Sequence, residues 1–284
     1  MNVKDTKFFF QNELNSIYDK NELDEITWRV LEHLSGKSKL DIVLERSIRF
    51  DKNKLQEIIN ELKKNIPIQY VLGYEWWGSM KLIVNEHVLI PRPETEELAL
   101  LVSQYIQTLN KNNEILLIDI GTGSGCMPIF IKKNNPLVSV EAMDISNEAL
   151  SVAKMNAEQQ NVFIHFFQSD ILKEGFINKK KYDIIVSNPP YVLPDEKRDM
   201  HVRVLENEPN VALFVTNKDP LQFYKAIATF AKSNLKKEGK IFLEINPLFA
   251  DVLYQYFNES GFHCLIKEDM YQNRRFAIIQ FLIM

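Results

Sequence analysis

The sequence has few of the residues that form disulfides or bind metals. Its 284 residues include only two cysteines, Cys126 and Cys264, which lie far apart and in apolar surroundings. We expect both to be buried free thiols rather than a disulfide or part of a zinc site. The five histidines are scattered without the spacing of metal ligands, so no metal site is predicted.

The sequence also lacks an excess of positive charge and any long apolar run. Lysine and arginine total 34 against 38 acidic residues, and the net charge of −4 does not indicate a nucleic acid as the main partner. No stretch approaches the ~20 apolar residues of a membrane helix, and the N-terminus lacks the pattern of a signal peptide. We therefore expect a cytoplasmic globular protein.

The first part of the chain has a helical pattern. Asp51 is a possible helix N-cap, and Gly36 is placed to end a helix. Short helices need tertiary packing to persist, so residues 1–69 are predicted to form a small all-helical domain. Apolar residues recur at helical spacing in two sets: Leu23, Ile26, Val30, Leu31 and Leu34, then Leu55, Ile58, Ile59 and Leu62.

The pattern becomes extended near Pro67. The next twenty residues contain the turn-forming residues Gly73, Gly78 and Asn85. Residues 82–84 and 88–90 are apolar and are predicted to pair as strands. Residues 70–92 should therefore form a β-hairpin that links two domains.

From residue 93 onward, helices and strands alternate. This alternation predicts a mostly parallel seven-stranded sheet with helices on both faces, an α/β fold over residues 93–284. Helices are expected at 94–109, 125–132, 147–159, 221–235 and 250–260, and strands at 115–120, 138–143, 163–167, 182–187, 240–245, 262–267 and 276–281.

A glycine-rich loop, Gly121-Thr122-Gly123-Ser124-Gly125, follows the first of these strands. Ligands of such sheets bind at the carboxyl ends of the strands, and glycines let the backbone approach a ligand closely. Cys126 stands where the dinucleotide fingerprint has its last glycine, so the match to a diphosphate site is imperfect. Asp144 ends the next strand, and its carboxylate could accept hydrogen bonds from both ribose hydroxyls. These features predict an adenosyl ligand without a diphosphate. Asp170, after the third strand, could face the adenine or merely cap the chain.

The tetrapeptide Asn188-Pro189-Pro190-Tyr191 ends the fourth strand. The prolines stiffen the loop and hold Asn188 extended. The Asn188 side-chain oxygen and the Pro189 carbonyl can then accept the two hydrogens of a planar NH2 group. Such acceptors orient the nitrogen and stabilise charge that develops on it during methyl transfer. Tyr191 is expected to form a flat wall for the substrate.

The chain resembles the bacterial release factor glutamine methyltransferases, the HemK/PrmC family. The motif at Asn188 is shared with adenine-N6 DNA methyltransferases and ribosomal-protein glutamine methyltransferases. The segment at residues 91–96 and the N-terminal helices favour the release-factor enzymes. The segments that carry the resemblance are residues 67–73, 89–96, 121–125, 187–192, 208–214 and 243–245.

The resemblance implies a Rossmann-like class I S-adenosylmethionine-dependent methyltransferase domain. It implies methyl transfer from S-adenosyl-L-methionine, leaving S-adenosyl-L-homocysteine, to N5 of the glutamine in the Gly-Gly-Gln motif of class 1 peptide release factors. It also implies that the helical domain docks the factor, and we expect a monomer without a stable nucleic-acid or membrane partner. Implied glutamine contacts are Asn188, Pro189, Pro190 and Tyr191. Implied cofactor contacts are Gly121, Thr122, Gly123, Ser124, Gly125, Asp144, Ile171 and Asn188.

Several alternatives stay open at this point. The chain could be a ribosomal-protein glutamine methyltransferase, an adenine-N6 nucleic-acid methyltransferase or a non-catalytic cofactor sensor. Arg92 and residues 94–96 could line the methionine end of the cofactor or only form a charged helical turn. Trp76 and Trp77 are expected to pack the hairpin, and Lys179-Lys180-Lys181 to form a solvated loop. Asn246 replaces a glycine common among relatives, without a physical reason visible in the sequence.

Overall fold

The computed structural model describes residues 3–45, 50–109, 114–173, 180–215 and 219–282. The chain divides into two compact units. The helical unit comprises Met1–Tyr74 and His201–Asn207, and the sheet unit comprises Glu75–Met200 and Glu208–Met284. None of the helices in the described part of the chain has the length and apolar character that a membrane span requires.

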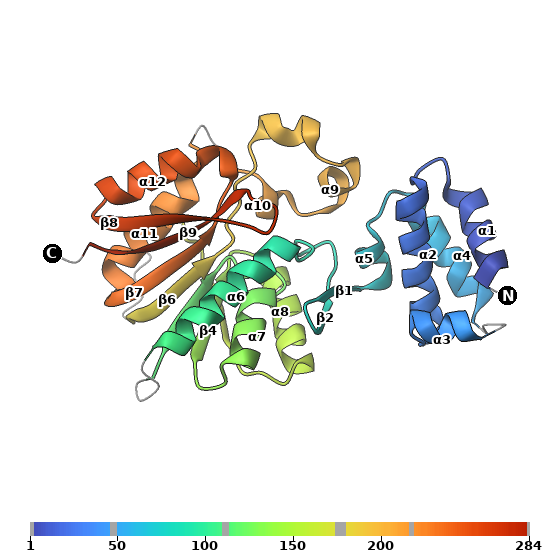
Figure 1. Ribbon diagram of the computed structural model, residues 1–284, viewed down its shortest axis with the longest axis horizontal. Coiled ribbons are helices and arrows are strands. Elements are labelled where there is room, and N and C mark those ends of the chain that lie inside the picture. Colours follow the sequence, from blue (N-terminus) through green and yellow to red (C-terminus); the bar gives the residue numbers. More distant parts are fainter. Residues whose placement is uncertain (1–2, 46–49, 110–113, 174–179, 216–218, 283–284) are drawn as a thin grey trace. The chain divides into compact units, whose positions relative to one another are not determined.

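The helical unit is built around the two predicted apolar faces (blue in Figure 1). As expected, Asp51 caps one of its helices, and Gly36 ends another with a left-handed φ of 68°. Asp19, which was not predicted as a cap, caps the helix that Gly36 ends. Phe10, Leu14 and Leu62 are among the fully buried residues of its core. The helices are α1 (Val3–Leu14), α2 (Lys20–Ser35), α3 (Lys39–Leu44), α4 (Lys52–Leu62), α5 (Ile68–Leu72) and α9 (Val202–Asn207).

The helix α9 joins this unit from a distant part of the sequence. Arg203 forms an ion pair with Glu22, and its guanidinium lies 4.0 Å from the centre of the Tyr18 ring. The Asn207 side-chain amide donates to the Asn65 carbonyl at 3.1 Å. The domain division predicted from the sequence does not include this segment, because a six-residue helix is too short for its apolar pattern to show which core it joins.

A strand pair opens the sheet unit, and it differs from the predicted hairpin. Strand β1 (Tyr74–Trp77) pairs with β2 (Met80–Ile83) across a two-residue turn in which Gly78 has a φ of 55°. Residues 88–90 are not a strand, so the predicted pairing of 82–84 with 88–90 is wrong. The predicted hairpin had its turn at Asn85, whereas the observed turn is the shorter one at Gly78. The observed strand pair therefore lies nearer the N-terminus than the predicted one.

The predicted mostly parallel seven-stranded sheet is confirmed. Its order is β5-β4-β3-β6-β7-β9-β8, and β9 runs antiparallel to both β7 and β8. The strands are β3 (Leu116–Ile120), β4 (Ser139–Asp144), β5 (His165–Gln168), β6 (Tyr182–Ser187), β7 (Leu235–Glu244), β8 (Phe262–Glu268) and β9 (Arg274–Phe281). The helical segments are α6 (Pro93–Thr108), α7 (Cys126–Asn134), α8 (Asn147–Gln159), η1 (Pro194–Asp199), α10 (Asn210–Leu213), α11 (Gln222–Asn234), η2 (Pro247–Phe249) and α12 (Ala250–Glu259).

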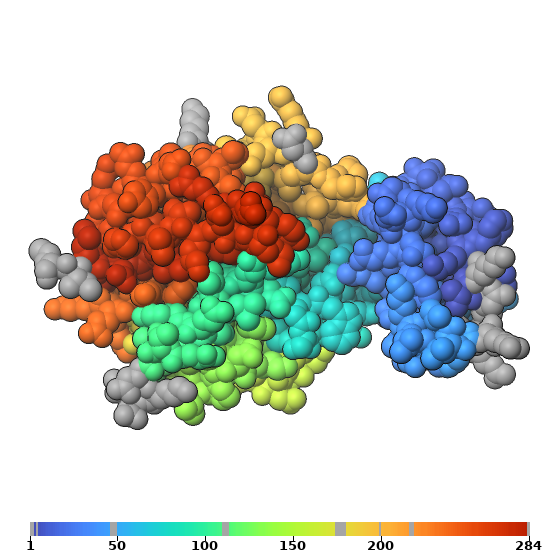
Figure 2. All heavy atoms as spheres, viewed as in Figure 1, coloured from blue at the N-terminus to red at the C-terminus, as the bar shows by residue number. Residues whose placement is uncertain are grey.

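Both faces of the sheet are covered, which explains its nearly continuous apolar strands. Leu117 and Val186 point into a core shared with α6 and α7, whereas Ile118 and Ile185 point into a core shared with α11 and α12. The helices are seen on both sides of the sheet in Figure 1. In Figure 2 the green surface of α6 and the red surface of the β8–β9 region meet. The Glu97 carboxylate of α6 accepts the Met270 N–H at 3.1 Å.

The strand order places three loops at one edge of the sheet. Strand β3 lies between β4 and β6, and Ile120 is in register with both Met143 and Ser187. The loops that begin at Gly121, Asp144 and Asn188 therefore leave the sheet side by side. This is the position at which open α/β sheets bind their ligands.

Candidate functional site

A cavity of about 300 Å³ lies at this edge of the sheet unit. Its lining includes most of the residues predicted from the sequence, namely Gly121, Thr122, Gly123, Ser124, Asp144, Ile171, Asn188, Pro189 and Pro190. Gly125 and Tyr191 are not part of the lining. A wider hollow of about 640 Å³ lies at the opposite ends of the strands, near Leu116 and Ser139, and contains none of the motif residues.

The glycine loop has the backbone that its sequence predicts. Gly121, Gly123 and Gly125 have φ values of 75°, 54° and 79°, which side-chain-bearing residues rarely adopt. No atom lies within 4 Å of where a Cβ would stand at Gly121 or Gly123, so the backbone is open there. At Gly125 a Cβ would stand 3.1 Å from the Ala153 Cβ. The first two glycines therefore leave room for a ligand, and the third allows close packing of helices.

Four of the five N–H groups of this loop, those of Gly121, Thr122, Gly123 and Gly125, are already bonded within the protein. A diphosphate needs free loop N–H groups at this position. With these donors occupied, the loop suits the predicted ligand without a diphosphate. The bonds run from Gly121 and Thr122 to the Met143 carbonyl at 2.9 and 3.0 Å, from Gly123 to Asp144 Oδ2 at 2.8 Å, and from Gly125 to the Thr122 carbonyl at 2.9 Å.

Asp144 both ties the loop in place and faces the cavity. Its carboxylate accepts the N–H groups of Gly123 at 2.8 Å and Ser146 at 3.0 Å. Burial raises the pKa of Asp144, and these backbone donors lower it. A carboxylate has about four acceptor sites, so capacity remains for ligand hydroxyls.

Asp119 is a buried acid that the sequence reasoning did not select as a site residue. It is fully buried, and within the described residues neither oxygen has a hydrogen-bond partner. Burial, with a smaller contribution from Asp144, raises its pKa to about 7, against the lowering effect of the nearby Thr122 hydroxyl. An orphaned buried carboxyl is rare and calls for a partner. A cationic ligand group beside Ile120 and Thr122 would supply one. The sequence feature that could have identified Asp119 as a site residue is its carboxyl within an otherwise apolar strand.

Asn188 is held by a residue at the start of α6. Its Nδ2 donates to Thr95 Oγ1 at 3.1 Å. The Thr95 hydroxyl in turn donates to Glu244 Oε2 at 2.8 Å. Glu244 ends β7 and is almost completely buried. Sequence reasoning included Thr95 only as part of the segment 94–96 and did not select Glu244 as a site residue, since no local pattern connects the two.

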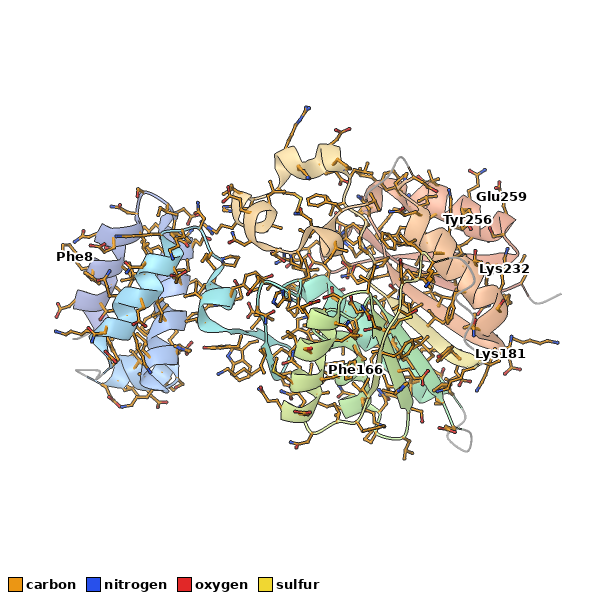
Figure 3. The ribbon with its side chains drawn as sticks, turned by 180° about the vertical axis from the view of Figure 1, so that it is seen from behind. Phe8, Phe166, Lys181, Lys232, Tyr256 and Glu259 are labelled. Carbon is orange, nitrogen blue, oxygen red and sulfur yellow. The ribbon has the colours of Figure 1, made fainter. Side chains whose placement is uncertain are left out.

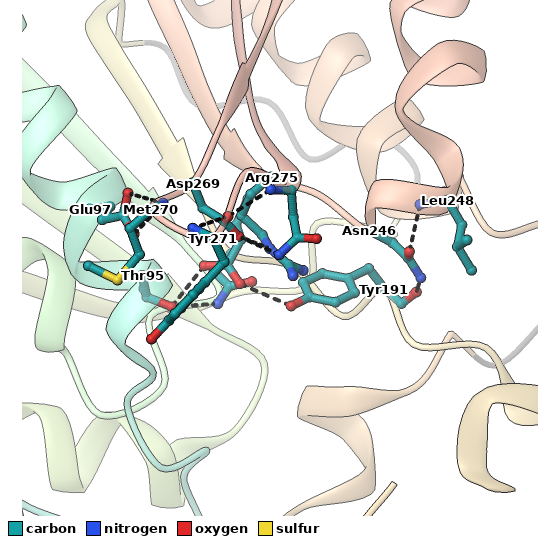
Figure 4. Close-up of polar contacts among 12 residues, drawn as sticks. Thr95, Glu97, Tyr191, Asn246, Leu248, Asp269, Met270, Tyr271 and Arg275 are labelled. Carbon is teal, nitrogen blue, oxygen red and sulfur yellow. Dashed lines mark hydrogen bonds and ion pairs between the residues drawn. The ribbon is translucent and has the colours of Figure 1, made fainter. Parts of the chain in front are cut away.

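Tyr191 lies beside this group instead of lining the cavity (Figure 4). Its hydroxyl donates to Glu244 Oε1 at 3.0 Å. Asn246 donates to the Tyr191 carbonyl at 3.3 Å and accepts the Leu248 N–H at 3.0 Å. Its amide also lies 3.0 Å from a Glu196 carboxylate oxygen. The structure therefore gives a physical reason for asparagine at this position, because it secures the loop after Pro190.

The alternatives at Asp170 and Arg92 are clarified by their contacts. Asp170 lines the cavity and also accepts the Leu172 N–H at 2.9 Å, so it caps the chain. Arg92 lines the cavity and pairs with the buried Glu208 at 2.6 Å. Glu94 and Glu96 occupy the first turn of α6 and are not part of the lining.

The remaining sequence-based expectations concern packing. Trp77 is buried, and its Nε1 donates to the Arg92 carbonyl at 2.8 Å, whereas Trp76 is exposed. Lys180 pairs with Glu141, and Lys181 points away from the sheet unit in Figure 3. Lys179 lies outside the described residues. Both cysteines are buried and free, as expected.

Known proteins share this architecture and sequence. The family model "Methyltransferase small domain" matches residues 100–213. A release factor glutamine methyltransferase of Flavobacterium psychrophilum is 37% identical, over 99% of this chain and 100% of its own length. One from Bacteroides thetaiotaomicron is 39% identical, over 85% of this chain and 86% of its own. The crystal structure of a methyltransferase from Pyrococcus furiosus has the same fold, with a TM-score of 0.52, 17% identity and coverage of 81% and 98%.

The fold and the family match together define a methyltransferase with a Rossmann-like sheet. Identity extends over the whole chain, including the helical unit. The chain belongs to the release factor glutamine methyltransferase family, which confirms the resemblance seen in the sequence.

Proposed function

We propose that this protein transfers a methyl group from S-adenosyl-L-methionine to the side-chain amide nitrogen, N5, of the glutamine in the Gly-Gly-Gln motif of class 1 peptide release factors. The observation that carries the proposal is the shared cavity at the ends of β3 and β6, where the glycine loop faces Asn188 and Pro189. Family membership adds the substrate class.

The residues present fit the cofactor. Asp144 would accept the ribose hydroxyls, and Ile171 would form an apolar wall for the adenine. Gly121, Thr122, Gly123 and Ser124 would hold the methionine portion. The buried Asp119 carboxyl, which is not part of the cavity lining but lies in β3 just before this loop, would supply the counter-charge of its ammonium group. When bound, the cofactor supplies an electrophilic methyl group on a sulfonium.

The substrate amide would be held by two acceptors. Asn188 Oδ1 and the Pro189 carbonyl would each accept one N–H of the glutamine side chain. An amide nitrogen is a poor nucleophile because its lone pair is delocalised, and positive charge develops on it during attack. Preorganised acceptors stabilise that charge, and the rigid proline loop orients the nitrogen. The helical unit would dock the parent release factor, and the enzyme would act as a cytoplasmic monomer.

The test offers cofactor with a labelled methyl group together with three acceptors: a class 1 release factor, its Gly-Gly-Gln variant with glutamine replaced by alanine, and duplex DNA. We expect label in the unmodified factor alone. Asn188→Ala should lower kcat by ~100-fold or more, while the calorimetric Kd for cofactor changes little. Label in DNA, or equal label in the two factors, would contradict the proposal.

A further inference from the structure

A polar chain runs from the core of the sheet unit to the proposed catalytic amide. Thr95, Tyr191 and Arg275, which belong to this group or lie beside it, are labelled in Figure 4. We infer that Thr95 and Glu244 are positioning residues that set the orientation of the Asn188 side chain, so that its oxygen and not its nitrogen faces the substrate. This inference rests on the proposed function, because it concerns the acceptor that holds the glutamine amide.

The direction of the hydrogen bonds follows from the chemistry of each group. An ionised carboxylate only accepts hydrogen bonds, and a threonine hydroxyl has a single proton. Glu244 Oε2 takes that proton at 2.8 Å. Thr95 Oγ1 then has only lone pairs left for Asn188, so the group that meets it at 3.1 Å must be the amide nitrogen. The opposite amide orientation would place two acceptors against each other.

Several donors hold the Glu244 side chain in place. The Tyr191 hydroxyl donates to its second oxygen, Oε1, at 3.0 Å. Burial raises the pKa of Glu244, whereas the Thr95 and Tyr191 hydroxyls and the nearby Arg275 guanidinium lower it. Arg275 is itself held by Asp269 at 3.3 Å. Hydrogen bonds arranged in a chain through a low-dielectric interior reinforce one another.

The chain connects three separate elements. Glu244 ends β7, Thr95 lies in the first turn of α6, and Asn188 follows β6. Thr95 is 4% exposed and lines the cavity, whereas its neighbours Glu94 and Glu96 do not. The segment at residues 91–96 therefore contributes Thr95 to the site, in addition to Pro91 and Arg92.

The consequence for the reaction is specific. If the Asn188 amide turned over, its NH2 group would face the NH2 group of the substrate, and two donors would oppose each other. The acceptor for the charge that develops on the nitrogen would then be lost. The rate of methyl transfer should fall, while the affinity for cofactor should be retained, because the glycine loop and Asp144 are unchanged.

The main test compares Thr95→Val, which keeps the shape of the side chain, with Thr95→Ser, which keeps the hydroxyl. We expect Thr95→Val to lower kcat by about 10- to 100-fold, as is typical for outer partners of active-site groups. Thr95→Ser should stay within about threefold of the wild type, and both should bind cofactor within about twofold by calorimetry. Thr108→Val is the matched control, since Thr108 lies at the other end of α6 and its hydroxyl donates to the Tyr105 carbonyl. Equal losses in Thr95→Val and Thr95→Ser, or normal kcat in Thr95→Val, would overturn the inference.

A double-mutant cycle separates positioning from general structural damage. If Thr95 acts through Asn188, then Thr95→Val should cause no further loss of kcat in an Asn188→Ala background. A full additional loss would show that Thr95 acts by another route and would overturn the inference.

A measurement without substrate distinguishes this inference from the proposed function. In ¹⁵N-labelled full-length protein, the Asn188 side-chain NH2 signal is assigned by its disappearance in Asn188→Ala. It should shift and exchange faster with solvent in both Thr95→Val and Glu244→Gln. An unchanged signal would overturn the positioning role. Failure of the wild type to label any release factor would overturn the proposed function instead.

Discussion

At the residue scale, two of the buried acids in the sheet unit, Glu244 and Asp119, have different surroundings. Glu244 is bonded by the Thr95 and Tyr191 hydroxyls and lies near Arg275. Asp119 has no hydrogen-bond partner within the described residues. The first carboxyl is organised by the protein itself, and the second is suited to a ligand. Buried polar groups without partners cost stability, and such groups tend to occur at functional sites.

The prediction at this scale concerns the pH dependence of stability. The pKa of Asp119 is raised by burial from 3.8 to about 7. Between these values the folded protein holds a proton that the unfolded chain has released. The stability from protonated Asp119 is therefore fully present below pH 3.8 and is lost as the pH rises through about 7.

The asparagine side chain in Asp119→Asn cannot ionise, so this variant should not lose stability as the pH rises through about 7. Relative to the wild type, the variant should gain stability between about pH 4 and pH 8, by up to ~4 kcal/mol. Thermal unfolding of both proteins without cofactor, across this pH range, measures the difference. A difference in Tm that stays constant with pH would show that Asp119 does not titrate there.

At the element scale, the junction between β3 and α7 joins ligand binding to helix packing. Gly121 and Gly125 both have positive φ, but only at Gly125 would an added Cβ meet other atoms, among them Ala153 Cβ and Ile129 Cδ1 at 3.1 Å. One loop therefore uses glycine for two reasons: open space for a ligand at its start, and close helix contact at its end.

The prediction for this element compares two alanine substitutions. Both Gly121→Ala and Gly125→Ala should cost ~1–2 kcal/mol of backbone strain. Gly125→Ala should cost a further ~1–3 kcal/mol from overpacking. Urea unfolding should therefore show Gly125→Ala as the less stable variant, whereas calorimetry should show the larger loss of cofactor affinity in Gly121→Ala. The reverse order of stabilities would contradict the packing account.

At the scale of the whole molecule, the chain passes between the two units more than once. After the loop at Asn188 and η1, residues 201–207 join the helical unit, and the chain then returns to the sheet unit at Glu208. Arg203 holds this segment through Glu22 and Tyr18. The helical unit is thus connected in sequence to the proposed catalytic loop as well as to the strand pair.

The prediction at this scale concerns Arg203. Arg203→Ala removes a partly buried ion pair and a cation–π contact, which together contribute ~1–2 kcal/mol. Hydrogen exchange of the α9 amides should become about tenfold faster, and cofactor affinity should remain within about twofold. Arg198→Ala, an exposed change in η1, is the control. Equal exchange in the two variants would show that Arg203 does not hold α9.

The sequence by itself determined the elements whose signals are local. The helix Asn147–Gln159 and the strand Tyr182–Ser187 were predicted with the observed bounds, because apolar spacing and a change of composition mark their ends. The glycine loop and the proline-stiffened loop at Asn188 were also readable, since each is a short run of residues with restricted backbone choices.

Tertiary structure alone decided which distant residues meet. The turn at Gly78 selected the strand pair, and α9 joined the helical unit through side chains far from it in sequence. Thr95 and Glu244 are 149 residues apart, yet they share one hydrogen bond behind Asn188. Local propensity acts over a few neighbouring residues, whereas such contacts depend on strand order and helix packing. The folded sheet therefore decides which residues form the polar chain behind Asn188. No single segment of the sequence predicts them.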